Sequence, residues 1–215
     1  MTSFVSRSSL AVAICSLVLT SSAVAQIKVE VGASVGMYSP VGGFKSASVH
    51  SSSLPNSASD LSGASFGAQL RLWVAPRVGF QLAGATSSTE VGNGLFSPGG
   101  RTPTTNASIS TGSAQLLFLV TPEAGTARVW LGAGGGAIRH GGSTYEPFGT
   151  PVNYGAVMSV GSAIRIRGGL SANLGLTSMI YNLDIRGTAA TDPGLSERGQ
   201  QVDLLVHTGL SYSWH

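Results

Sequence analysis

The segment from Gln201 to His215 alternates between apolar and polar residues along its length. Successive side chains of a β-strand point to opposite faces, so this segment would have one apolar and one polar face. The apolar face holds Val202, Leu204, Val206, Leu210, Tyr212 and Trp214, and the polar face holds Gln201, Asp203, His207, Gly209, Ser211 and Ser213. A water-soluble sheet normally carries charge on its polar face and does not gather aromatic residues at the chain end. We therefore expect the apolar face to contact lipid.

The chain carries few charges for its length. Lys, Arg, Asp and Glu make up 10% of its 215 residues, whereas soluble domains contain roughly 25%. Beyond the N-terminal region, no segment is apolar for long enough to form a spanning helix. Because backbone groups in lipid must be hydrogen-bonded internally, a closed β-barrel is the remaining spanning structure. The near balance of 12 basic and 9 acidic side chains gives no indication of a nucleic-acid partner.

The first 25 residues have the layout of a secretory signal peptide. One basic residue, Arg7, precedes an apolar stretch at 10–19, and the small residues Ala23 and Ala25 follow. This arrangement predicts cleavage before Gln26. We therefore expect residues 1–25 to be a cleaved signal peptide and residues 26–215 to form one barrel domain.

Seven further segments alternate in the same way as the last one. The predicted strands are 26–37, 64–74, 78–87, 107–120, 127–138, 152–166, 170–181 and 201–215. A slip of one residue in the first strand would push Lys28 and Glu30 into lipid, so its register is well specified. The fourth segment is irregular, because Leu117 and Leu119 fall on its otherwise polar face. The predicted fold is all-β, an eight-stranded antiparallel up-and-down transmembrane β-barrel.

The connections between these segments alternate in length. Short turns are expected near Pro76, Pro122 and Gly168, and long connections at 38–63, 88–106, 139–151 and 182–200. Short periplasmic turns and long outer loops are typical of outer-membrane barrels. With an even number of strands, both termini are expected in the periplasm.

The C-terminal residues resemble the closing strand of bacterial outer-membrane β-barrels. In that family the assembly signal has a glycine, then an aromatic or apolar position and a final aromatic position, which here are Gly209, Tyr212 and Trp214. His215 departs from the pattern, since the aromatic residue usually ends the chain. The alternation and loop lengths are similar to the small eight-stranded family typified by the transmembrane domain of outer-membrane protein A. The resemblance implies a monomer in a Gram-negative outer membrane, in contact with lipid and lipopolysaccharide and inserted by the barrel assembly machinery.

Six ionisable residues on the predicted inner face, most of them toward the periplasmic end, are candidates for a polar plug. They are Lys28, Glu30, Arg71, Arg128, Arg165 and His207. Buried charges must be paired, so we expect a network of ion pairs and hydrogen bonds that plugs the lumen. The excess of cations over Glu30 leaves an alternative, a narrow, partly hydrated conduit that attracts anions.

Residues that could support hydrolysis occur in two of the predicted loops. His50 and Asp60 share the first loop, and His140, Ser143 and Glu146 share the third. Related small barrels include lipid A deacylases and acyltransferases, which set His and Ser together beside a rigid strand. Because these candidates fall in Gly- and Ser-rich loops, we expect no enzymatic activity.

A glycine-rich run imitates a dinucleotide-binding motif. Gly132, Gly134 and Ala137 match its spacing, but no segment able to form the required helix follows. Inner-face glycines would instead leave room for large neighbours such as Trp73 and Trp130 in a narrow lumen. The four scattered histidines do not suggest a metal site, and no cofactor is expected.

The function predicted from these features is structural or surface-interacting, with the long loops as the contact surface, because loops on a rigid scaffold commonly carry binding. One alternative is a narrow channel or a carrier for small, including hydrophobic, solutes. A less favoured alternative is a membrane enzyme that modifies lipid A.

Overall fold

The computed structural model describes residues 27–41, 62–92, 104–122, 125–143, 152–186 and 196–214. The predicted signal peptide, with Ala23 and Ala25, lies outside the described residues. The same holds for most of the long loops, including His50, Asp60 and Glu146, and for His215.

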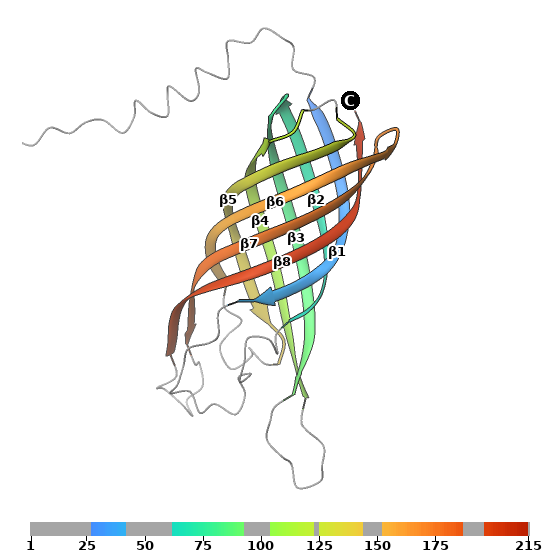
Figure 1. The fold of residues 1–215 in the computed structure, drawn as a ribbon. Coiled ribbons are helices and arrows are strands. Elements are labelled where there is room, and N and C mark those ends of the chain that lie inside the picture. Colours follow the sequence, from blue (N-terminus) through green and yellow to red (C-terminus); the bar gives the residue numbers. More distant parts are fainter. Residues whose placement is uncertain are drawn as a thin grey trace, which may run out of the picture.

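Eight antiparallel strands form one closed barrel, in which each strand pairs with its neighbours in the sequence and β8 pairs with β1 (Figure 1). The strands are β1 Lys28–Pro40, β2 Gly63–Ala75, β3 Val78–Gly92, β4 Thr104–Leu119, β5 Ala127–Gly141, β6 Val152–Arg167, β7 Leu170–Arg186 and β8 Ser196–Trp214. Closure satisfies the edge groups of β1 and β8, which would otherwise be unpaired. The predicted fold class is confirmed.

Most strands extend further than predicted at the end away from the short turns. β7 continues to Arg186 and β8 begins at Ser196, so both occupy part of the connection predicted at 182–200. The predicted strands stop where the positions expected to face outward are no longer consistently apolar, as at Asn182 and Asp184 of β7. Backbone pairing continues there regardless, and the strands of 13–19 residues exceed the roughly 9–11 needed to span a membrane.

The outward face of the barrel is a belt of large apolar side chains. Phe66 is 62% exposed, Leu82 57% and Leu131 51%, and their chain neighbours Gly67, Gln81 and Gly132 point inward. In the irregular strand β4, Leu117 and Leu119 point inward and are almost fully buried. The assignment of faces from alternation is confirmed in β4 as well as in the regular strands.

The three short connections lie at one end of the barrel, together with the start of β1 and the end of β8 (Figure 1). Pro76 and Arg77 turn β2 into β3, and Gly168 and Gly169 turn β6 into β7. Gly168 has a φ of 55°, a left-handed conformation that glycine adopts without strain. Among the described residues, no helix is long and apolar enough to cross a membrane.

Glycines on the inner face accommodate the two lumenal tryptophans. Gly161 lies directly under the indole of Trp130, and a Cβ at Gly79 would come within 2.8 Å of the Trp73 ring. A side chain at Gly132 would collide with neighbouring inner side chains as well. Large inner side chains therefore occupy the space that neighbouring glycines leave free, as expected for the narrow lumen of an eight-stranded barrel.

The proposed assembly signal lies on the strand that closes the barrel. Tyr212 and Trp214 point outward with ring centroids 5.9 Å apart, and they pair in register with Val31 and Val29 of β1. We predict that Tyr212→Ala combined with Trp214→Ala sharply reduces membrane insertion in cells, measured as the heat-modifiable folded band. Ser213→Ala, on the inner face of the same strand, is the control. Insertion equal to that of the control would contradict an assembly role for these rings.

Candidate functional site in the barrel lumen

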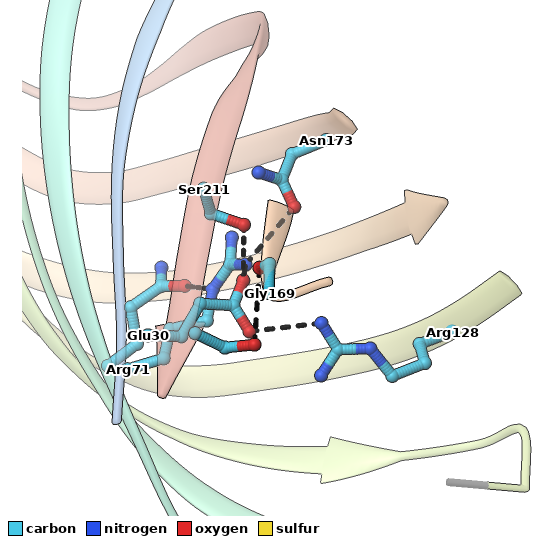
Figure 2. A network of polar contacts seen from close by, with 8 residues as sticks. Glu30, Arg71, Arg128, Gly169, Asn173 and Ser211 are labelled. Atoms are coloured by element: carbon cyan, nitrogen blue, oxygen red, sulfur yellow. Dashed lines mark hydrogen bonds and ion pairs between the residues drawn. The ribbon is translucent and has the colours of Figure 1, made fainter. Parts of the chain in front are cut away.

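A buried ion-pair network crosses the lumen toward the end with the short turns. Glu30 of β1 accepts hydrogen bonds from Arg71 Nη1 at 2.7 Å, Arg128 Nη2 at 3.0 Å and Ser211 Oγ at 2.8 Å. Figure 2 shows the carboxylate between the two guanidinium groups, with Ser211 and Asn173 directed toward the same centre. Arg71 and Glu30 are each 1% exposed. The carboxylate therefore neutralises charge contributed by strands on both sides of the barrel.

Arg71 is held on several sides. Its Nε donates to Gln81 Oε1 at 2.7 Å, and its Nη1 lies 3.4 Å from Asn173 Oδ1. Its guanidinium carbon lies 4.1 Å from the centre of the Trp130 ring, a cation–π geometry. Five strands thus meet at one side chain, and Arg71 has little room to move.

Apolar side chains complete this level of the lumen. A buried cluster packs beside the ion pairs and consists of Trp73, Leu117, Leu119, Trp130 and Ala163. We call this cluster, together with Glu30, Arg71 and Arg128, the turn-side layer. The Leu residues that make β4 irregular in sequence are part of this layer.

The structure brings three of the six predicted plug residues into one network, namely Glu30, Arg71 and Arg128. Lys28 is buried at the start of β1, and His207 is half-buried and lines the lumen nearer its middle, away from the Glu30 carboxylate. Arg165 does not fit the prediction, because it is exposed. Arg165 lies near the end of β6, close to the turn at Gly168 and Gly169, where residues 164–168 are all exposed.

A second buried polar group lies toward the other end of the barrel. Asp203 Oδ2 accepts hydrogen bonds from Tyr38 Oη at 2.6 Å and Tyr181 Oη at 2.8 Å, and Oδ1 accepts from Gln201 Nε2 at 3.1 Å. Tyr181 Oη also lies 3.3 Å from His140 Nε2. In the described part of the chain no Lys or Arg forms an ion pair with Asp203, so neutral donors hold this carboxylate.

Large apolar residues surround this second group. The buried cluster consists of Tyr38, Ala107, Ile109, Ile138, Val157, Met179, Tyr181 and Leu183, with Leu205 packed against it. We call this cluster and Asp203 the loop-side layer. It fills a second level of the lumen, nearer the long connections than the turn-side layer.

Sequence reasoning does not predict the loop-side layer. The apolar pattern assigns Tyr38 to a loop and places Asp203 on the inner face without a partner. Extending the alternation of β1 beyond Met37 puts Tyr38 on the same face as Lys28 and Glu30. This alternation is the sequence signal that could have identified Tyr38 as an inner residue.

Of the candidate catalytic residues in the predicted loops, the structure describes only His140 and Ser143, and these two lie in different surroundings. His140 lies inside the lumen on β5 and is 2% exposed, so its assignment to a loop is wrong. Ser143 follows β5 and is exposed, and its hydroxyl accepts a hydrogen bond from the backbone N–H of Asn106 at 3.0 Å. Asp203 and His207 both face inward, but the Asp203 carboxylate is engaged by the tyrosines. Within the described residues, no three His, Cys, Asp or Glu side chains are grouped to hold a metal.

Solved structures of small outer-membrane proteins are similar to this barrel. The outer membrane protein OprG of Pseudomonas aeruginosa aligns with a TM-score of 0.54 and 13% identity, over 88% of this chain and 95% of OprG. A major outer membrane protein of Thermus thermophilus aligns at 0.50 and 15%, over 87% and 99% of the two chains. Neisserial surface protein A aligns at 0.50 and 11%, over 86% and 96%. No protein-family model and no curated protein sequence matches the chain.

At these identities the similarity establishes the fold and not a shared activity. The chain is an eight-stranded β-barrel protein of the outer-membrane type. Its lumen contains two buried layers, one with the ion pairs of Glu30 and the other with the hydrogen bonds to Asp203.

Proposed function

We propose that this protein is a closed outer-membrane barrel with a structural or surface-interaction role, and not a pore. The observation that carries the proposal is that two separate layers of buried side chains fill the lumen. A hydrated ion would have to displace the Glu30 ion pairs and then the tyrosines bonded to Asp203. Each step separates groups that are buried and hydrogen-bonded, which is costly in a low-dielectric interior.

The outward apolar belt and the fold support insertion in an outer membrane, in contact with lipid and lipopolysaccharide. Because the short turns lie at the same end of the barrel as the start of β1 and the end of β8, we place the termini in the periplasm and the long connections outside the cell. In this orientation the strands extend past the outer membrane surface, so the long connections lie outside the membrane and can bind other molecules. Insertion by the barrel assembly machinery and a monomeric state belong to the same proposal.

The proposed role is not enzymatic. Catalysis by a His and Ser pair needs the two groups within hydrogen-bonding reach, whereas His140 is enclosed in the lumen and Ser143 is outside it. The test is an assay for lipid A modification with the purified protein and with its His140→Ala variant, and we expect no modification by either. Modification by the unmodified protein that is lost in His140→Ala would overturn the proposal that the protein is not an enzyme.

The role as a closed barrel is tested by conductance in planar lipid bilayers. The unmodified protein should give no stable conductance. Glu30→Ala alone should also stay near the baseline, because the loop-side layer still closes the lumen. Adding Tyr38→Ala and Tyr181→Ala to Glu30→Ala should produce channel openings, since both layers are then breached.

Two outcomes would contradict the proposal that two layers close the barrel. Stable conductance of the unmodified protein would favour the narrow-channel function. Openings with Glu30→Ala alone would mean that the loop-side layer does not close the lumen.

A further inference from the structure

The connection between β6 and β7 carries two exposed arginines at the edge of the outer apolar belt. Arg165 and Arg167 are both exposed, and Ile166 between them is 57% exposed. Arg167 pairs in register with Leu170, whose partner on β8 is the outward-facing Tyr212. Register partners lie on the same face of a sheet, so Arg167 stands on the lipid-facing side of the barrel. A guanidinium group therefore lies at the boundary where the apolar belt ends.

The positive charge of this turn is not balanced by a nearby described carboxylate. Neither arginine forms an ion pair in the part of the chain that the structure describes. Glu30 of the turn-side layer is bonded to Arg71 and Arg128 and is only 1% exposed. Asp203 belongs to the loop-side layer, toward the other end of the barrel. Among the described residues the turn thus presents cationic groups that an external anion could bind.

Two aromatic rings lie beside this positive charge. The rings of Tyr212 and Trp214 stack with their centroids 5.9 Å apart, and these residues are 54% and 47% exposed. A Cβ at Gly169 would lie 3.1 Å from Tyr212 Cε2, so the Tyr212 ring reaches the turn itself. Tyr and Trp side chains favour the boundary between the hydrocarbon core and the lipid headgroups. The rings therefore place the turn at the level of the headgroups.

We propose that Arg167, Tyr212 and Trp214 form a binding site for an anionic glycerophospholipid of the periplasmic leaflet. A guanidinium group binds a phosphate through two parallel hydrogen bonds. Arg165 adds a second positive charge, which favours a headgroup with a net negative charge over a zwitterionic one. The two rings and Leu170 contact the glycerol region and the upper part of the acyl chains. The site rests on the membrane insertion and orientation proposed above, with the short turns toward the periplasm.

The fluorescence of Trp214 provides the test, because the other two tryptophans, Trp73 and Trp130, are buried in the lumen. The purified protein is folded into phosphatidylcholine vesicles that contain a small fraction of brominated lipid, either phosphatidylglycerol or phosphatidylcholine. Bromine atoms quench nearby tryptophans. We expect the brominated phosphatidylglycerol to quench with an apparent affinity about two- to fivefold higher, the range for an exposed ion pair. Heat-modifiable migration reports insertion separately, so a protein that fails to insert is distinguished from one without lipid preference.

Three variants separate a defined site from diffuse attraction to the whole end of the barrel. Arg167→Gln should abolish the preference for phosphatidylglycerol. Arg77→Gln removes an exposed cation from the turn between β2 and β3 at the same end, and should leave the preference unchanged. Trp214→Phe should remove the difference in quenching between the two lipids, because the remaining tryptophans are lumenal. Equal quenching by both lipids in the unmodified protein, an equal loss in both arginine variants, or a difference that persists in Trp214→Phe would overturn the proposal.

Discussion

Glu30→Ala should destabilise the folded barrel by about 3–5 kcal/mol, the usual cost of removing one partner of a buried ion pair. Arg71 and Arg128 would both remain buried without the carboxylate that neutralises them. Arg71 cannot turn toward solvent, because Gln81 and the Trp130 ring hold it in place. The measurement is the urea midpoint of the folded, heat-modifiable form in lipid vesicles.

The control for this prediction is Ser213→Ala. Ser213 lies near the same end of the lumen, and its hydroxyl makes only a 3.3 Å hydrogen bond to the Gly169 carbonyl. Equal urea midpoints for Glu30→Ala and Ser213→Ala would show that the network does not stabilise the barrel.

A combined variant separates charge from packing. Replacing Glu30, Arg71 and Arg128 together with Leu or Met removes every charge of the network and retains much of its volume. Apolar replacements of buried ion networks are often neutral or stabilising. The triple variant should therefore recover most of the stability lost in Glu30→Ala. A larger loss than in Glu30→Ala would mean that shape, and not charge balance, governs this layer.

The turn-side network could be predicted in part because strand alternation determines the face of each residue. Alternation puts Glu30, Arg71 and Arg128 inside, and Glu30 pairs with Arg71 in direct register on adjacent strands. The contact with Arg128 crosses the lumen from β5 and depends on the tilt and stagger of the closed barrel. Arg165 shares the inward periodicity, but it lies next to the turn that follows β6, where the neighbouring residues are exposed as well.

The loop-side layer is harder to predict for a different reason. Its members lie beyond or near the ends of the apolar alternation, where a sequence pattern no longer distinguishes a strand from a loop. Tyr38 and Leu183 fall in predicted connections, yet both are buried on long strands. Backbone pairing with neighbouring strands extends these segments, and pairing between distant segments leaves no local signal.

Leu82→Arg should cost about 2–4 kcal/mol of folding stability in a bilayer, the range for a cation on the lipid-facing side near the midplane. Leu82 points outward from β3, is 57% exposed, and pairs in register with Leu70 and Ala114. Neither of these register partners is acidic, so neither could pair with a new guanidinium. The new guanidinium would have to reach along the barrel surface to find water.

The matched control is Ser88→Arg on the same strand and the same face. Ser88 is exposed and lies six residues closer to the loop end, which corresponds to roughly 20 Å along a strand. An arginine there should reach the membrane surface or water and cost about 0–1 kcal/mol. Both variants would be measured by reversible urea unfolding in vesicles of the same lipid. Equal costs at Leu82 and Ser88 would mean that the apolar belt does not mark the membrane-embedded part of β3.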